Sequence, residues 1–358
     1  MTAWLTRATL ADHAVAGWAH MSSPGVVVGS SSAELERLGD VSAATLGAAG
    51  IDRTDRVMVA LANDGIAAGS LVARAAVTLG ATAGSVSPRG RTRVIRALRS
   101  LRATTLITTP CGAADLLARI FIEFGLQPED LGLRRVLVGG EIPSPGTLRQ
   151  LGDEFDCDIQ RLLLDPFTGA ALAQGIDRFE VTATDLVACA VLDRDELASG
   201  GVDGAYELVV RAGGESDAWL RTGEVVLGAP SAVTAPVASH TVGDHVLARG
   251  RWLSLPAIDR ALAGIDGVAH WYLDVSRDGT LDRVAVVVAL DRPALVDDAM
   301  WAGRIREAVE SVVPVRVETR AVGVDDDTPA QEPSTVLDHR GHHVGLDRKA
   351  AARAFAAP

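Results

Sequence analysis

The sequence predicts an α/β protein with a large N-terminal domain around a mostly parallel sheet and a small C-terminal α+β domain. In the first half, short apolar runs alternate with longer stretches of helical periodicity, a pattern typical of βαβ units. Alternating strands punctuated by turns replace this pattern after about residue 182. Because 358 residues exceed the usual size of one hydrophobic core, we expect two domains. The expected ranges are 1–245 for the large domain, 246–324 for the small domain and 325–358 for a flexible tail.

The parallel sheet is predicted from five short apolar runs. These runs cover residues 26–28, 57–61, 104–108, 136–138 and 162–164. Between them, residues 66–79 and 113–124 carry apolar side chains three and four positions apart, as helices packed on a sheet do. Right-handed crossovers would place such helices on the faces of the sheet.

Antiparallel or barrel-like strands are predicted at 206–212 and 225–228, and a compact α+β unit follows from about residue 250. Its pattern predicts a helix, two strands, a second helix and a third strand, at 256–263, 268–275, 284–290, 296–312 and 315–322. The Asp-Gly pair at 278–279 is a hairpin signal. The acidic, proline-containing stretch at 325–333 predicts a flexible segment, and 347–356 is a candidate helix.

The composition excludes several classes of function. A net charge of −12 at pH 7 argues against a nucleic-acid or anionic-membrane partner, since either would favour a basic face. No stretch has the layout of a secretory signal or an apolar run of the ~20 residues that a bilayer needs, so we expect a cytoplasmic protein. The spacing of Cys111, Cys157 and Cys189 predicts buried thiols rather than disulfides or a zinc site. Lys349 is the only lysine in the chain.

Two local clusters have both a structural and a chemical interpretation. Three serines at 30–32 followed by Glu34 are typical of a capped helix start, whereas a serine nucleophile would need a G-x-S-x-G turn. His339, His342 and His343 could ligate a metal or carry acid–base chemistry. Without matching carboxylates, however, this cluster is more typical of a solvated surface.

Five segments, taken in order, carry a resemblance to a known family. Residues 139–144, Gly-Gly-Glu-Ile-Pro-Ser after a strand, resemble the adenine-contacting G-A-E-P turn of the phenylacetate-CoA ligases, which are adenylate-forming acyl-CoA synthetases. Leu-Arg-Thr-Gly-Glu at 220–224 resembles Y-R-T-G-D, whose aspartate binds the ribose of ATP. Residues 49–57 and 106–110 resemble two of the family's strand motifs, and 243–250 resembles its hinge motif before a mobile C-terminal domain.

The resemblance covers about residues 22–338 and implies the family's fold, with a shortened N-terminus. At the hinge, His245 stands where the family often has a carboxylate. The implied cofactor-binding residues are Gly139, Gly140, Glu141, Arg221, Glu224, Asp244 and Arg249. No residue is assigned a catalytic or metal-binding role.

Three parts of the family's adenylation machinery are missing or altered. Residues 22–29, Ser-Ser-Pro-Gly-Val-Val-Val-Gly, stand in place of the twelve-residue phosphate loop S-S-G-T-T-G-K-P-T-V-V-G, which predicts a tight turn rather than a phosphate cradle. The family's Y-G-L-S/T-E aligns with 162–166, where no glutamate occurs and Asp165 could replace it only with a displacement of one residue. The stretch 330–338, aligned with the catalytic-lysine motif, contains no lysine.

The sequence thus predicts a degenerate relative of the phenylacetate-CoA ligases that binds or acts on an acyl, CoA or carrier-protein partner without ATP-dependent adenylation. AMP or CoA remain candidate cofactors, whereas magnesium-ATP is not expected. Two alternatives stay open: an atypical acyl-CoA ligase or acyltransferase of a biosynthetic pathway, and a pseudoenzyme that serves as scaffold or regulatory subunit. A homodimer or a complex with another protein is compatible with either.

Overall fold

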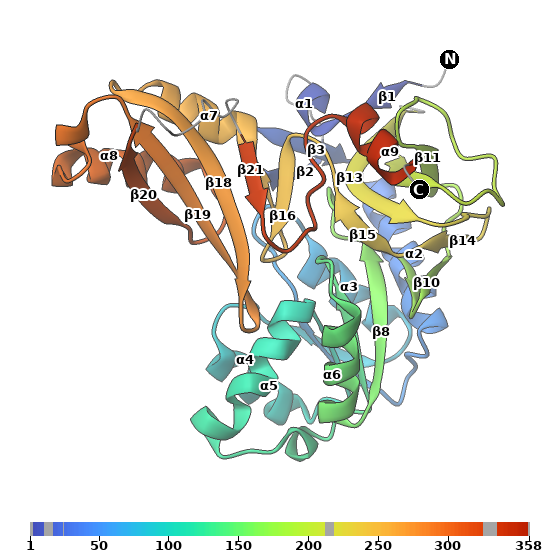
Figure 1. Ribbon diagram of the computed structural model, residues 1–358. Helices are drawn as coiled ribbons and strands as arrows, with labels where there is room; N and C mark the ends of the chain where they lie inside the picture. The colour runs from blue at the N-terminus through green and yellow to red at the C-terminus, as the bar shows by residue number, and fades with distance from the viewer. Residues whose placement is uncertain (1–2, 11–16, 24, 212–217, 325–334, 357–358) are drawn as a thin grey trace. The chain divides into compact units, whose positions relative to one another are not determined.

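The computed structural model describes residues 3–10, 17–23, 25–211, 218–324 and 335–356, and they fall into two compact units (Figure 1). Unit 1 takes the described residues of Met1–Ser22, Val26–Ser239 and Ala352–Pro358, and unit 2 takes those of Ser23–Gly25 and His240–Ala351. The chain passes into unit 2 within β15 (Ala238–Thr241), a few residues before the predicted boundary at 245. Within the described part of the chain, every helix is too short or too polar to cross a membrane.

An eight-stranded sheet forms the centre of unit 1. Its order is β14-β10-β9-β8-β7-β6-β4-β5; β8, β7, β6, β4 and β5 run parallel, and β9, β10 and β14 are antiparallel to their neighbours. The strands are β4 (Arg56–Ala60), β5 (Thr82–Ser85), β6 (Thr105–Thr108), β7 (Arg135–Gly139), β8 (Asp158–Leu164), β9 (Ala171–Gly175), β10 (Arg178–Val181) and β14 (Thr234–Pro236). The predicted α/β class with a largely parallel sheet is confirmed.

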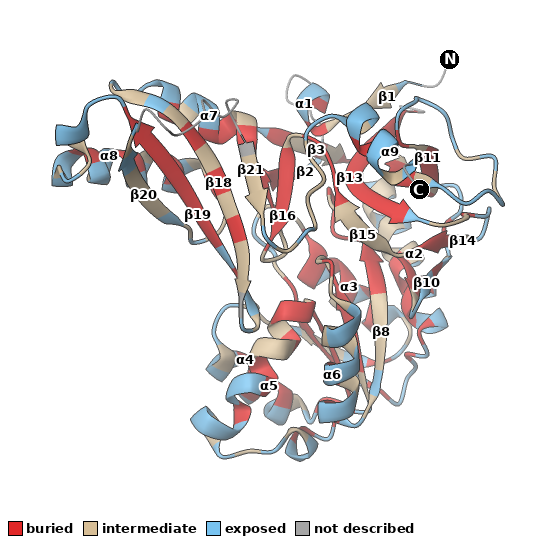
Figure 2. Cartoon of the chain, viewed as in Figure 1, coloured by how far each residue is buried: buried red, intermediate tan, exposed pale blue. Residues whose placement is uncertain are grey.

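Helices cover both faces of this sheet because neighbouring residues of each strand point to opposite sides. Val57 and Val59 of β4 pack with two helices, α2 (Ser32–Ala48) and α3 (Ala68–Thr78). Met58 and Ala60 pack on the other side with α4 (Arg91–Leu101), α5 (Pro110–Phe124) and α6 (Pro145–Phe155). In Figure 2, the buried residues of these helices are coloured red. The 3₁₀ turn η1 (Pro128–Leu131) precedes β7.

The first helix on the sheet begins where the serine cluster predicted. Ser31 Oγ accepts a hydrogen bond from the Glu34 amide at 3.3 Å, and Glu34 Oε2 accepts one from the Ser31 amide at 2.7 Å. This reciprocal capping box satisfies backbone donors that a helix start leaves unpaired. The structural interpretation of these serines is therefore confirmed.

A second sheet in unit 1 is mostly antiparallel and follows the order β1-β13-β12-β11, with β15 pairing β13. Its strands and the nearby short helix are β1 (Trp4–Leu5), β11 (Val187–Val191), β12 (Ala205–Arg211), β13 (Trp219–Leu227) and α1 (Arg7–Leu10). It corresponds to the antiparallel strands predicted after residue 182.

The apolar run at 26–28 does not join the parallel sheet, which corrects the sequence prediction. It forms β3 (Val26–Ser30), which pairs only with β2 (Trp18–Ser23) in a separate two-stranded sheet. The reason lies in packing, since Val26 and Val28 are buried against residues of the second sheet such as Leu208 and Leu220. The two strands are separated by only residues 24 and 25.

Unit 2 contains the predicted α+β arrangement. The hairpin of β16 (His245–Ala248) and β17 (Arg251–Ser254) leads into α7 (Leu255–Ala263). A sheet of order β20-β19-β18-β21 follows, in which β18 and β19 are antiparallel and Gly279, at φ +62°, turns the chain between them. The remaining elements of unit 2 are β18 (Val268–Asp278), β19 (Leu281–Leu290), η2 (Pro293–Leu295), α8 (Ala299–Val312), β20 (Glu318–Gly323) and β21 (Thr335–Asp338). The helix α9 (Arg348–Ala356) begins in unit 2 and ends in unit 1.

The predicted tail at 325–358 is only partly a separate segment. Residues 325–334, where a flexible stretch was predicted, lie outside the described part of the chain. Strand β21 pairs in parallel with β18 and thus belongs to the sheet of unit 2. Its Val336 packs against the core of that unit, which explains why the strand joins the sheet. The helix predicted at 347–356 is present as α9.

Candidate ligand pocket

Unit 1 contains a pocket at the carboxyl ends of the parallel strands β7 and β8. Its volume is about 30 Å³, and its lining includes Gly140, Glu141, Arg161, Leu164, Phe179 and Glu224. A buried water needs ~10–15 Å³ by this measure, so the pocket has room for about two waters or one small polar group. Three of the seven predicted cofactor-binding residues, Gly140, Glu141 and Glu224, therefore meet at one pocket.

The two glycines of the turn after β7 have different roles. A Cβ on Gly139 would lie 2.7 Å from the Leu162 carbonyl oxygen, so glycine lets β7 and β8 approach here, and this residue does not line the pocket. Gly140 has φ +80°, a left-handed conformation that other residues rarely adopt. Together they turn the chain sharply at the edge of the pocket.

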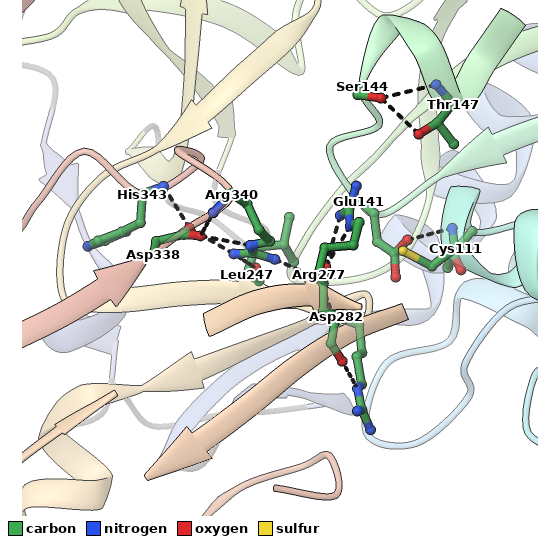
Figure 3. A network of polar contacts seen from close by, with 12 residues as sticks. Cys111, Glu141, Ser144, Thr147, Leu247, Arg277, Asp282, Asp338, Arg340 and His343 are labelled. Carbon is green, nitrogen blue, oxygen red and sulfur yellow. Dashed lines mark hydrogen bonds and ion pairs between the residues drawn. The ribbon is translucent and has the colours of Figure 1, made fainter. Parts of the chain in front are cut away.

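Glu141 lines the pocket and also stabilises the start of a helix. Its Oε2 accepts a hydrogen bond from the Cys111 amide at 2.9 Å, as Figure 3 shows, and that amide lies in the first turn of α5. A carboxylate at a helix N-terminus is favoured by the helix dipole. At least one carboxylate oxygen of Glu141 is thus engaged within the protein.

Glu224 on β13 is the most enclosed acid of the pocket. Its side chain is 9% exposed, and among the described residues Oε2 has no hydrogen-bond partner although it is fully buried. Burial raises the pKa of Glu224 to about 7; the charge of Arg7 opposes this rise, and Asp165 and Glu207 add to it. At neutral pH, Glu224 is therefore balanced between its acid and carboxylate forms.

Arg221, the residue before Thr222 in the same motif on β13, has a different role. Its Nη1 pairs with Glu207 Oε2 at 2.7 Å and its Nη2 with Asp195 Oδ1 at 3.0 Å, and the guanidinium lies over the Trp4 ring. The other oxygen of Glu207 accepts the Gly223 amide at 2.8 Å. The structure thus places Arg221 in a buried ion pair of the second sheet and not in the lining of the pocket.

Asp165 is occupied by its own turn. Its Oδ1 accepts a hydrogen bond from the Phe167 amide at 2.9 Å, and its Oδ2 accepts one from the Thr168 hydroxyl at 2.6 Å. Burial raises the pKa of Asp165, while these hydrogen bonds lower it. Both oxygens of the residue considered as a replacement for the magnesium glutamate are therefore engaged in the loop between β8 and β9.

Arg161 on β8 lines the pocket and was not singled out in the sequence. Among the described residues it forms no hydrogen bond or ion pair, and its Nε is buried without a partner. Burial lowers the pKa of Arg161, and the charge of Asp177 opposes this shift. In the sequence, the only indication of this role is that a single arginine stands in the otherwise mostly apolar run Gln-Arg-Leu-Leu-Leu at 160–164.

The other two predicted residues, Asp244 and Arg249, belong to unit 2. Asp244 Oδ1 pairs with His245 Nδ1 at 2.9 Å; burial opposes ionisation, but His245 brings the pKa of Asp244 below its ordinary value. Arg249 has φ +51° in the turn between β16 and β17, where its amide and Nε donate to Asp282. Both side chains are held by contacts within their own unit.

The histidine cluster differs from the predicted solvated surface. His342 and His343 are partly buried, and burial lowers the pKa of each to about 4, so both are neutral at pH 7. Carboxylates do accompany the cluster, since His339 lies 3.5 Å from Asp274 and the His343 amide donates to Asp338. Nevertheless, a search of the described residues finds no group of acidic, histidine and cysteine side chains suited to a metal ion.

Comparison by sequence identifies no relative: no family model matches the chain, and no curated protein matches it significantly. Comparison by structure, in contrast, finds similar proteins. The chain is similar to 2-hydroxyisobutyryl-CoA ligase in complex with 2-HIB-AMP and CoA, at 18% identity and a TM-score of 0.77, over 95% of this chain and 76% of the ligase.

Two further solved structures agree. A malonyl-CoA ligase with methylmalonyl-CoA and AMP bound matches at 14% identity and a TM-score of 0.63, over 86% of this chain and 70% of that one. The amide bond synthetase McbA from Marinactinospora thermotolerans matches at 17% identity and a TM-score of 0.61, over 88% and 66%. The chain therefore has the fold of the adenylate-forming ligases. This confirms the fold that the sequence resemblance implied.

Proposed function

We propose that this protein keeps the ligand pocket of an adenylate-forming fold but does not form adenylates. Its role is to bind or act on an acyl group, free or carried by CoA or a carrier protein. One observation carries the proposal: the chain's only lysine, Lys349, is an exposed residue of α9. The family that the sequence resembles uses a lysine in the stretch aligned with 330–338, and an arginine does not replace such a point charge conservatively.

Two contacts support the loss of phosphate and metal handling. In the region aligned with the phosphate loop, β2 and β3 are separated by two residues, which leaves little backbone to wrap a triphosphate. Near the position where the resembled family has its magnesium-binding glutamate, both carboxylate oxygens of Asp165 accept hydrogen bonds from residues of the same turn. A metal ion bound through Asp165 would compete with these hydrogen bonds for the carboxylate oxygens.

The size of the pocket supports the same proposal. About 30 Å³ admits a small polar group, so a whole nucleotide would have to displace lining side chains. AMP and CoA remain candidate ligands only if part of the molecule enters the pocket and the rest stays outside it. We therefore expect the tightest ligands to be small acids or their thioesters.

Calorimetric titration tests the proposal with four ligands: magnesium-ATP, AMP, CoA and phenylacetate. We expect magnesium-ATP to bind no more tightly than AMP, and added magnesium to leave the ATP titration unchanged. Binding in the pocket should weaken in Glu224→Ala and stay unchanged in Glu36→Ala, an exposed residue of α2. Micromolar ATP binding that depends on magnesium would contradict the proposal.

A further inference from the structure

Arg161 is a partly buried charged group that makes no hydrogen bond or ion pair among the described residues. The guanidinium stays protonated at any pH at which the protein is folded. Burying a charge without a counter-charge is costly, and proteins normally pair such a group or leave it in water. Arg161 instead projects from a central strand into the lining of a pocket and makes no ion pair among the described residues. Asp177 acts on Arg161 only without an ion-pair contact, and an anionic ligand group would supply a counter-charge in direct contact.

Glu224 gives an independent indication from the same pocket. Its Oε2 is enclosed and lacks a hydrogen-bond donor among the described residues, and leaving a buried oxygen without a hydrogen bond is unfavourable. A ligand hydroxyl could donate to this oxygen. The cavity between these two polar groups is lined by apolar side chains, among them Leu162, Leu164 and Phe179.

We propose that the pocket binds a small hydroxylated anion, with the anionic group on Arg161 and the hydroxyl donating to Oε2 of Glu224. Arginine binds carboxylate and phosphate with the same forked geometry, so the anion is either one, on a body of two or three carbons. The small volume sets this limit on size. The inference rests on the proposed function, because it names the ligand class of the same pocket.

Titrations with simple probes test the assignment. Glycolate carries both groups, acetate lacks the hydroxyl, ethylene glycol lacks the anion, and inorganic phosphate represents the other anion. We expect glycolate or phosphate to bind, with acetate weaker than glycolate and ethylene glycol not detected. If phosphate binds and glycolate does not, the anion is a phosphate; if glycolate binds more tightly, it is a carboxylate.

Variants at Arg161 separate this site from general charge effects. Arg161→Gln should weaken binding of the preferred anion about tenfold or more, since a charge-assisted hydrogen bond is lost. Arg161→Lys keeps the charge and should retain more affinity than Arg161→Gln. The matched control Arg96→Gln removes an exposed arginine of α4 and should change nothing. Thermal unfolding of each variant verifies that it is folded.

Two results would overturn the inference: neither anion binds the wild-type protein, or Arg161→Gln binds as tightly as wild type. Arg161→Lys keeps the test decisive if the glutamine variant does not fold. ATP-dependent adenylation, in contrast, would contradict the proposed function and leave the anion assignment standing. The two failures are therefore distinguishable.

Discussion

Three buried acids, Asp165, Glu207 and Glu224, lie near two buried arginines, Arg7 and Arg221. Glu207 is paired with Arg221 and Asp165 is held in its turn, whereas Oε2 of Glu224 has no hydrogen-bond partner among the described residues. Because burial raises the pKa of Glu224 to about 7, its protonation changes near neutral pH. This residue connects the stability of unit 1 with the chemistry of its pocket.

The titration of Glu224 predicts a specific pH dependence of stability. Between the ordinary pKa of 4.5 and about 7, the folded protein holds a proton that the unfolded chain has lost. The contribution of this residue to the free energy of unfolding therefore falls as pH rises through that range. We expect Glu224→Gln to be about 1–3 kcal/mol more stable than wild type at pH 8 and nearly equal at pH 5.

Urea unfolding at both pH values measures this difference, with Glu36→Gln as an exposed control on α2. A stability difference between Glu224→Gln and wild type that does not change with pH would show that Glu224 titrates normally.

Sequence reasoning found some residues of the pocket and missed others for a clear reason. Gly140, Glu141 and Glu224 stand in short motifs whose order along the chain is readable. Arg7 does not line the pocket, but its charge acts on Glu224; it donates a hydrogen bond to the Thr222 carbonyl oxygen, 215 positions away, and no local pattern indicates such a contact. Arg161 was missed because an arginine in an apolar strand carries no motif. Arg221 was assigned to the cofactor because the motif does not say which way the side chain points.

At the scale of elements, Asp282 joins four segments of unit 2. This residue of β19 is 2% exposed and pairs with Arg340 Nη1 at 2.6 Å and Arg277 Nη2 at 2.9 Å. It also accepts the Arg249 amide at 3.2 Å, while Arg340 pairs further with Asp338 (Figure 3). The network fixes the β16–β17 turn and the chain after β21 to the β18–β19 hairpin.

Asp282→Asn should destabilise unit 2 strongly, because it leaves the buried Arg340 with one counter-charge fewer. Breaking a buried ion pair costs about 3–5 kcal/mol, whereas an exposed pair contributes about 1 kcal/mol or less. The matched control is Asp291→Asn, which removes an exposed acid paired with Arg292. Urea unfolding followed by tryptophan fluorescence compares the two, and equal small losses would contradict the role given to Asp282.

Helices and strands could be predicted where the local pattern of apolar and polar side chains determines the secondary structure. The parallel strands at 57–61 and 104–108 were placed correctly because both of their faces are buried, which requires continuous apolar runs. The run at 26–28 is equally apolar but packs elsewhere, and its sequence does not distinguish the two sheets. Strand β21 was missed because its pairing partner, β18, ends at Asp278, far earlier in the chain, and no local pattern indicates such a pairing.

At the scale of the whole molecule, the fold of an adenylate-forming ligase is present, and departures from the resembled family at three functional points stay a prediction from the sequence. The fold follows from apolar patterns that tolerate low identity, as the 18% match at a TM-score of 0.77 illustrates. Chemistry depends on single groups. A preorganised cation at a developing charge accounts for ~10²- to 10³-fold in rate, so the position of one lysine decides whether adenylation proceeds.

Acid-dependent release of pyrophosphate from ATP tests the absence of adenylation most directly. Wild type, Lys349→Ala and the control Arg353→Ala, which removes another exposed cation of α9, are compared with phenylacetate and with small acids as substrates. We expect background release from all three proteins with every acid. Measurable release by wild type and Arg353→Ala that Lys349→Ala abolishes would contradict this expectation and identify the protein as an atypical ligase.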